Sequence, residues 1–483
     1  MIWAPLIVAL IAGWLLASAL TRTAWADSGW MGLLGEFSLA ALVGPGLASV
    51  LFFLLLLAGI ASATSVFAML AVLAAGSFTL WWRFRQTGPH PSEPAGRLSR
   101  FPWTWALLVA LIAGLAVFAL IFQAFTQSNP SGDWDASAIW NVRARFLAGG
   151  LELWRRALSS ELGGHLFGAA HPSYPLFLSS FVALQWVGAG NFDPGAPIAA
   201  GLLFSLGAFL LVGAGLARGT SVALGLLAWL VLLGSDVFTS QAALQYSDLP
   251  LGLAFLATLV LLDRAERAGS SPRLLIAAGL ALGFTPWIKN EGWPFAAAAL
   301  AVAVWRFGRR GILPVTLGAA PGLAATILLK VVSQGHEALI PSTSGGISGK
   351  LLDPARWWHI FLGFGQALLG AGQWWAHPVI LVAALAVALR LLPAAERRAR
   401  LWLWIPIAAT LAAEFGIYLL TPADLDWQVR GSASRLLAQV WPSLIWLVFL
   451  MLRSPEEYYP AHQPVQATVT AASGKRKRKH ARA

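Results

Sequence analysis

The sequence predicts an all-α fold, a polytopic transmembrane helix bundle with about 13–14 membrane helices. Only 11% of the 483 residues are charged and 58% are apolar. The mean hydropathy of +0.69 lies far outside the balance of a soluble domain. Apolar runs of about 17–25 residues, long enough to cross a hydrocarbon core of roughly 30 Å, separate nearly all the charged segments. The chain lacks the recurrent alternation over about ten residues that a membrane β-barrel needs, so helices are expected to satisfy the backbone inside the bilayer.

The apolar runs place the expected spans along the whole chain. The first run follows Met1–Pro5, which lacks the basic residues of a signal peptide, and no convincing cleavage site follows it. We therefore expect a retained helix. The spans are expected to begin near residues 2, 39, 63, 104, 174, 197, 220, 248, 274, 293, 311, 375, 401 and 436.

Basic loops set the expected orientation. Most of the 33 Lys and Arg residues fall in five stretches, which the positive-inside rule places on the cytoplasmic side. These stretches are residues 83–100, 264–273, 306–310, 390–400 and Arg453 with the C-terminal run. The loops expected to face outward are residues 124–172, Lys289–Gly292, 334–374 and 421–435.

One short apolar run conflicts with this orientation if it crosses the membrane. Residues 124–172 and 235–247 can both be external only when an even number of crossings separates them, and three runs lie between them. We therefore expect residues 174–190 to form a re-entrant or interfacial helix.

The C-terminal segment changes composition. Residues 453–483 are polar and contain the run Lys475-Arg-Lys-Arg-Lys479, so we expect a disordered basic cytoplasmic tail. The run is typical of attraction to anionic membrane lipids and of an orientation signal, whereas a nuclear or RNA-binding signal is the weaker interpretation. The net charge of +12 lies in short loops and this tail, so nucleic acid is not an expected partner. The chain contains no cysteine, which excludes disulfides and thiolate metal sites.

The segment Ser131–Leu147 carries two acids at an expected membrane surface. Trp134, Ala138, Ile139, Val142 and Phe146 follow helical spacing, which predicts an amphipathic helix lying in the interface with Ser131 or Asp133 as its N-cap. Asp133 and Asp135 are either caps and helix-dipole partners or acids of a site. A carboxylate at the mouth of a bundle can act as a general base, and Asp135 is the candidate for this role.

Two further motifs carry charges at span ends. Asp248 in Gln245-Tyr-Ser-Asp-Leu-Pro250 has the position of an N-cap before a helix whose first turn tolerates proline. Lys289 and Glu291 in Ile288-Lys-Asn-Glu-Gly-Trp-Pro294 fit snorkelling anchors as well as a site. Structural and functional interpretations stay open for all three residues.

The segment Leu420–Arg435 is more polar than a loop facing water requires. It carries two acids together with Trp427, Arg430 and Arg435. His171 precedes an expected Pro-rich turn, and a lone histidine is more often a hydrogen-bonded loop residue than a ligand. No His and carboxylate pair has metal-ligand spacing, so a divalent metal is unsupported. The flexible composition of residues 334–350 is that of a lid or of an idle linker.

Taken in order, these pieces resemble the bacterial GT-C membrane glycosyltransferases, a group that includes protein mannosyltransferase-like and aminoarabinose transferase-like enzymes. The pieces are the acidic motif at 131–147, Tyr246-Ser-Asp-Leu-Pro250, Lys289-Asn-Glu-Gly292 and Thr421-Pro-Ala-Asp-Leu-Asp-Trp427 with Arg435-Leu-Leu. The resemblance covers residues 104–452. It implies a GT-C-like catalytic domain there, with amphipathic juxtamembrane helices on an external loop, and additional N-terminal transmembrane helices in residues 1–103.

The resemblance also implies an activity and a location. It implies sugar transfer from a polyprenyl-phosphate donor to an extracytoplasmic lipid, glycan or protein, in a bacterial inner membrane with the active face external. An external-loop Asp of the family corresponds to Asp135, with Asp133 second. Family members often have Asp-Glu at this place, whereas this chain has Asp133-Trp-Asp135, so the choice of base between the two acids stays open. No bound cofactor is implied.

The expected chemistry suits the residues found. A phosphate monoester leaving group needs cations, which Lys289 and Arg435 supply, and a single base on the opposite face gives inversion. Other expected donor or substrate contacts are Glu291, Arg430, Asp248, Trp427 and His171. Two alternatives remain: a polymerase or ligase of diphosphate-linked glycans, and a lipid or solute transporter such as a flippase. Glu36, Glu414 and Lys330, in or beside apolar runs, favour the transporter.

Overall fold

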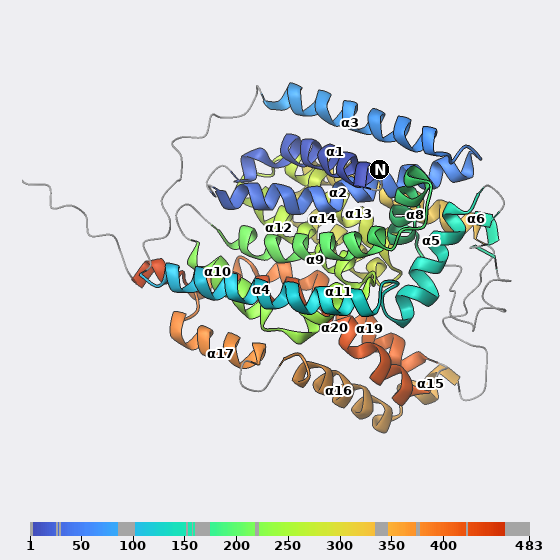
Figure 1. The fold of residues 1–483 in the computed structure, drawn as a ribbon. Helices are drawn as coiled ribbons and strands as arrows, with labels where there is room; N and C mark the ends of the chain where they lie inside the picture. Colours follow the sequence, from blue (N-terminus) through green and yellow to red (C-terminus); the bar gives the residue numbers. More distant parts are fainter. Residues whose placement is uncertain are drawn as a thin grey trace, which may run out of the picture.

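The computed structural model is an all-helical bundle (Figure 1). It describes residues 3–25, 28, 30–85, 102–150, 153–156, 158–159, 174–217, 222–333, 346–372, 377–421 and 424–458. Within these ranges the only extended pairing is one isolated bridge between Leu391 and Leu452. The predicted all-α, multi-pass fold is therefore confirmed. His171, residues 334–345 of the expected lid and residues 459–483 lie outside the described residues.

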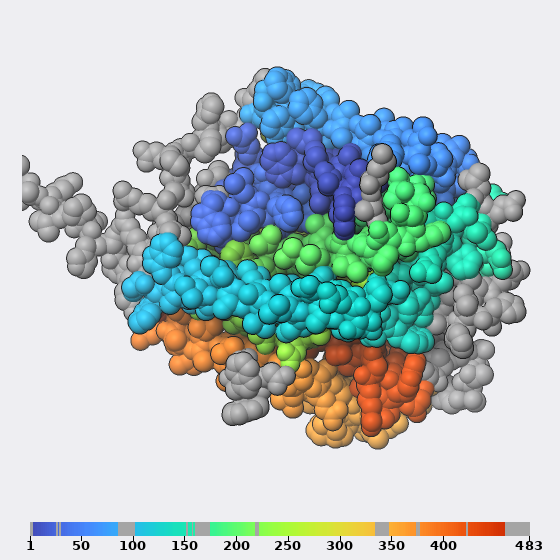
Figure 2. Space-filling model, viewed as in Figure 1, coloured from blue at the N-terminus to red at the C-terminus, as the bar shows by residue number. Residues whose placement is uncertain are grey.

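The bundle has buried helices at its centre and helices with exposed apolar side chains at its periphery. α12 (Asp248–Arg267) and α13 (Pro272–Ile288) are almost completely buried. α3 (Ala63–Arg85) and α4 (Thr104–Ser128) expose most of their apolar side chains, as helices that face lipid would. Figure 2 shows α4 running along the surface of one face, with α3 at one edge and α16–α17 at the other. The other main helices are α1 (Trp3–Thr21), α2 (Trp30–Leu57), α5 (Asn141–Ala148), α8 (Phe177–Ala189), α9 (Gly195–Leu216), α10 (Ala223–Leu233), α11 (Asp236–Leu244), α14 (Gly292–Val332), α15 (Gly346–Leu351), α16 (Pro354–Leu369), α17 (Pro378–Leu389), α19 (Ile405–Leu420) and α20 (Leu425–Leu450).

Fewer helices than predicted are long and apolar enough to cross a membrane alone. Eight satisfy both conditions among the described residues, or nine when α10 and α11, bent by 69° at their junction, count as one span. The other predicted runs correspond to the shorter apolar helices α8, α13 and α17, to α12 with its charges, and to the second half of α14. Length and hydropathy thus identify eight or nine membrane-spanning helices in the described residues, fewer than the 13–14 predicted. α8 has 13 residues, about 20 Å, which is too short for a full crossing.

α14 is two helical arms joined at Gly308. Its backbone there is non-helical, with φ 58° and ψ −155°, a region that glycine adopts readily. Arg306 forms an ion pair with Glu266 near one end of the bundle. Lys330 Nζ donates to Asn290 Oδ1 over 3.0 Å near the other end, where α14 begins. The arms therefore run antiparallel, in the positions where the sequence predicts spans near residues 293 and 311.

Small residues bring α13 and the second arm of α14 into backbone contact. A Cβ on Gly279 would lie 2.2 Å from Val315 O, and one on Gly318 would lie 2.1 Å from Ile276 O. Gly283 and Gly322 repeat this close approach four residues farther along each helix. Such small-xxx-small pairs replace the hydrophobic effect as the packing determinant between membrane helices.

Replacing Gly318 with Ala is expected to lower the free energy of unfolding by about 1–3 kcal/mol, because the backbones must separate. Reversible unfolding in detergent, followed by circular dichroism, measures this. Gly76→Ala in α3 is the matched control, since nothing lies within 4 Å of its added Cβ. It should be neutral or stabilising by up to about 1 kcal/mol. Equal stability of the two variants would contradict the close-packing account.

The loops with candidate motifs gather at one end of the bundle. α12 carries Asp248 at its first turn and Arg264 at its last, 16 residues or about 24 Å apart. Asp248 contacts Lys289 and Arg435, whereas Arg264 donates to Ala24 O and Ala217 O at 3.0 Å. The structure thus separates the motifs from the basic loops, as the orientation argument requires. Placement of the motif end outside the cytoplasm stays a prediction.

The acidic segment departs from the predicted interfacial helix. A π-helical turn, Ala136–Trp140, leads into α5. The buried stripe includes Ile139, Trp140, Arg143 and Leu147, while Trp134, placed on the predicted apolar face, is exposed. The buried stripe packs against α8, since Ser179 Oγ donates to Trp140 O over 2.9 Å. The segment is therefore built into the bundle.

The first residues of the predicted tail are ordered parts of the bundle. Pro455–Tyr458 form a helical turn, and the Glu456 carboxylate accepts hydrogen bonds from the backbone N–H groups of Val222 and Ala223 at 3.1 and 3.0 Å. Glu456 thus caps α10 from the far end of the chain, where a carboxylate suits the helix dipole.

Candidate functional site

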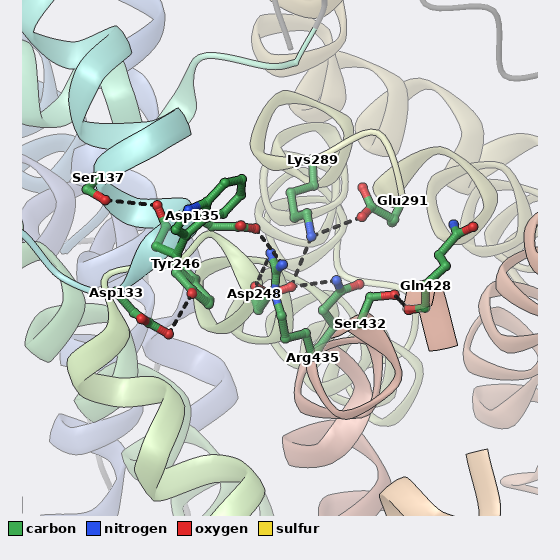
Figure 3. A network of polar contacts seen from close by, with 12 residues as sticks. Asp133, Asp135, Ser137, Tyr246, Asp248, Lys289, Glu291, Gln428, Ser432 and Arg435 are labelled. Carbon is green, nitrogen blue, oxygen red and sulfur yellow. Dashed lines mark hydrogen bonds and ion pairs between the residues drawn. The ribbon is translucent and has the colours of Figure 1, made fainter. Parts of the chain in front are cut away.

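Asp248 is the centre of a polar network at the motif end of the bundle (Figure 3). Its side chain is fully buried. Oδ1 accepts hydrogen bonds from Lys289 Nζ at 3.0 Å and from Gln439 Nε2 at 2.7 Å. Oδ2 lies 3.4 Å from Arg435 Nε. The interpretation of Asp248 as an N-cap is therefore wrong: Ser247 holds that position, and the Asp248 carboxylate is directed to distant partners.

Lys289 lies in the break between α13 and α14. Its extended backbone, φ −150° and ψ 155°, ends α13, and its side chain turns into the protein, where it is buried. The ammonium pairs with Asp248 at 3.0 Å and with Glu291 at 2.9 Å. Snorkelling toward water is therefore excluded for Lys289. Burial lowers the pKa of this ammonium, but the charges of Asp248 and Glu291 outweigh burial and raise its pKa overall, so Lys289 stays charged.

Arg435 connects the network to the acidic segment. From α20, its Nη1 lies 2.5 Å from Asp135 Oδ2. Its guanidinium stacks on the Tyr246 ring, 4.6 Å from the centroid, an arrangement that favours the cation. The side chains of Arg435 and Asp135 are 20% and 15% exposed, whereas Asp248 behind them is inaccessible. Arg435 therefore has one internal and one accessible carboxylate partner.

Tyr246 holds the second acid of the segment. Its hydroxyl donates to Asp133 Oδ2 over 2.9 Å. Burial and this bond to Asp133 raise the pKa of Tyr246, which keeps the phenol protonated. Asp133 does hold the predicted N-cap position, since the helix begins at Trp134 and the Ser137 N–H donates to Asp133 O over 3.0 Å, but its carboxylate is bound to this distant phenol.

Several hydrogen bonds fix the acidic segment to the turn before α12. Asn141 Nδ2 donates to Gln245 Oε1 at 2.8 Å and to Ser131 O at 2.9 Å. Gln245 adopts left-handed φ of 61° and donates to Pro130 O at 3.2 Å. Gly132 has φ 75°, and a Cβ on it would lie 2.7 Å from Leu244 O. Only glycine fits there, so the position of Asp135 is set from both sides.

Some expected site residues lie apart from the network. Arg430 pairs with Asp426 at 2.9 Å on the exposed surface of α20, and Trp427 is 73% exposed. Neither contacts the Asp248 network. Sequence reasoning assigned no role to Tyr246, Gln245, Asn141 or Gln439. Of these four, only Gln439 could have been found from the sequence, because a polar amide within an apolar span indicates a functional or buried polar position.

Comparison of the chain with models of protein families, with curated proteins and with solved structures gives no match. The function therefore has to be argued from the site. Within the described ranges, no three His, Asp or Glu side chains are arranged to hold a metal ion. The arrangement is a chain of alternating charges, from Asp135 through Arg435, Asp248 and Lys289 to Glu291.

The Tyr246→Phe variant is expected to lose about 1 kcal/mol of stability, since it removes one hydrogen bond but keeps the ring under Arg435. Tyr246→Leu removes both contacts and should cost about 1–2 kcal/mol more. Thermal unfolding in detergent measures the two losses. A Phe variant as unstable as the Leu variant would show that the hydroxyl, and not the stacked ring, carries the stabilisation.

Proposed function

We propose that the protein is a membrane glycosyltransferase of GT-C type, which moves a sugar from a polyprenyl-phosphate donor to an extracytoplasmic acceptor. The observation that supports it most is the Asp135–Arg435 pair. It joins an accessible acid and an accessible cation on rigid elements at one end of a membrane bundle. The host membrane under this proposal is a bacterial inner membrane, with the motif end outside.

The proposed reaction needs one base and one anion-binding cation. The acceptor hydroxyl or amine attacks the anomeric carbon and loses its proton to Asp135. The bond from that carbon to the phosphate oxygen breaks, and the polyprenyl phosphate leaves with the electron pair. A single displacement without a covalent enzyme intermediate inverts the anomeric configuration.

Arg435 is the proposed phosphate contact, and its geometry refines the role of Lys289. Lys289 is buried behind Asp248, so it positions that carboxylate and does not reach a ligand directly. A donor phosphate takes the place of the Asp135 carboxylate on Arg435, while Asp248 holds the guanidinium from the inner side. Donor binding then frees Asp135, which a tight Arg pair would keep from acting as a base.

The test is sugar transfer in liposomes that contain purified protein and radiolabelled polyprenyl-phosphate sugars, with a membrane extract as the source of acceptors. Labelled product that requires the protein supports the proposal. Product from diphosphate-linked glycans alone would instead identify the polymerase or ligase alternative. No product with any donor would remove the transferase proposal.

A transporter is the second candidate, and one observation favours it. Glu36 and Glu414 are buried within apolar spans, where transporters carry ionisable residues. Passage of a fluorescent polyprenyl lipid across protein-containing liposomes, without any chemical change to it, would support this alternative.

A further inference from the structure

α16 and α17 are each too short to cross a membrane, yet no charged residue separates them. α16 has 16 residues and α17 has 12, lengths of about 24 and 18 Å against the roughly 30 Å of a hydrocarbon core. Residues 357–389, which include almost all of both helices, contain no Asp, Glu, Lys or Arg. Arg356 and Arg390 flank this stretch. An uncharged stretch of this length is typical of a membrane crossing, whereas the sequence predicts that residues 334–374 face outward.

The outer ends of the two helices lie at opposite ends of α20, which is itself long and apolar enough to span. At the start of α16, His359 Nε2 lies 3.4 Å from Asp426 Oδ1, in the first turn of α20. Just beyond α17, Leu392 N donates to Met451 O, which follows the last residue of α20, over 2.8 Å. Figure 1 shows α16 and α17 one after the other along the same edge of the bundle. Together they therefore extend over the length of a complete span.

The inner ends of the two helices meet the junction of α10 and α11. Val237 N, in the first turn of α11, donates to Ala371 O over 3.4 Å. His377 contacts both helices, since its Nε2 lies 3.0 Å from Leu369 O and its Nδ1 accepts from Val379 N over 3.3 Å. α10 begins at the end with the basic loops and α11 ends beside the acidic segment, so their junction lies between the two ends. These bonds supply the partners that interrupted backbone needs inside a membrane.

The side of α16 that faces away from the bundle is apolar. Trp358, Phe361 and Leu369 are 61%, 63% and 74% exposed. Ile360 and Gly363, on the opposite side, are buried, and they pack against α20. Large apolar side chains gathered on one uncharged face fit hydrocarbon and not water.

We propose that α16 and α17 form one discontinuous membrane crossing, in which the exposed face of α16 contacts the hydrocarbon of the bilayer. Leu369 and Pro378, the inner ends of the two helices, then lie inside the membrane against the junction of α10 and α11. The proposal does not depend on which reaction the protein catalyses. It adds a crossing that a length rule misses, because neither half satisfies that rule alone.

Spin labels on α16 test its depth in the purified full-length protein, reconstituted in phosphatidylcholine vesicles. The chain has no cysteine, so a single introduced cysteine carries each label. Trp358→Cys and Leu369→Cys place labels on the same face of α16, 11 residues or about 16 Å apart along its axis. Relaxation by oxygen, which concentrates in hydrocarbon, is compared with relaxation by a water-soluble nickel chelate. Val117→Cys, in lipid-facing α4, is the control for the membrane interior, and Leu352→Cys, before α16, is the control for the surface.

The ratio of the oxygen effect to the nickel effect is expected to rise several-fold from Trp358→Cys to Leu369→Cys, and Leu369→Cys should match Val117→Cys. All four side chains are exposed, so the substitutions leave the packed core intact. Equal, shallow values at Trp358→Cys and Leu369→Cys would overturn the proposal and show a helix lying flat in the interface. High nickel accessibility at both would place α16 in water. Low accessibility to both reagents would show that another protein copy covers this face.

Discussion

Replacing Asp135 with Asn is expected to lower the rate of sugar transfer by about 10²–10⁴-fold, the usual contribution of a general base. The amide is nearly isosteric and can still accept a hydrogen bond from Arg435, so the fold should persist. Transfer assays in liposomes measure the rate, and circular dichroism in detergent checks the fold. This experiment follows the donor test above and depends on the proposed function.

Asp133→Asn is the matched control for Asp135→Asn. Asp133 lies two residues away and accepts a hydrogen bond from Tyr246, which an amide oxygen also accepts. We expect at most a few-fold loss of rate. A large loss in Asp133→Asn with an active Asp135→Asn would reverse the assignment of the base. Normal transfer by both variants would exclude a carboxylate base from this segment.

Replacing Lys289 with Met is expected to lower the free energy of unfolding by about 3 kcal/mol, because it leaves the buried Asp248 carboxylate without its closest cation. Arg435 remains at 3.4 Å and offsets part of the loss. Unfolding in detergent measures the effect. The pair is formed throughout the neutral range, since the pKa of Lys289 is raised. Its contribution is lost only as the pH rises through that alkaline value.

Two further variants test whether the stability loss of Lys289→Met comes from the buried ion pair or from the loss of any lysine. Lys330→Met removes an exposed lysine that bonds Asn290 at the same end of the bundle, and it should cost less than about 1 kcal/mol. Adding Asp248→Asn to Lys289→Met should restore part of the lost stability, because the fully buried side chain then carries no charge; Glu291, the other partner of Lys289, is partly exposed to solvent. A double variant less stable than Lys289→Met would contradict the ion-pair account.

Composition and apolar runs were sufficient to predict the class of fold, because a bilayer permits few alternatives to helices. Each predicted run falls on a helix. The length rule failed inside the bundle, where neighbouring protein and not lipid surrounds the backbone. There α8 ends after 13 residues and α10 bends into α11.

The sequence predicted most of the residues of the candidate site, but it did not predict how they contact one another. Asp135, Asp248, Lys289, Glu291 and Arg435 do meet in one network. Local rules assigned Asp248 and Asp133 to helix caps, since a cap can be read from a few neighbouring residues. Ser247 and not Asp248 holds the cap position of α12, whereas Asp133 does precede its helix. The side chains of both acids bind residues far away in the chain: Asp248 bonds Lys289, and Asp133 bonds Tyr246. The buried face of residues 131–147 was misassigned because it includes Arg143, which a search for apolar periodicity treats as exposed.

The position of Asp248 in the chain determines when its ion pairs can form during synthesis. Its two cationic partners follow it by 41 and 187 residues. At about 5–20 residues per second, Lys289 is synthesised roughly 2–8 s after Asp248 and Arg435 roughly 10–40 s after it. Until Lys289 is made the carboxylate has no counter-ion, so the start of α12 has to stay hydrated or within the insertion machinery. The polar network around Asp248 is complete only after α20 has been synthesised, because α20 carries Arg435 and Gln439.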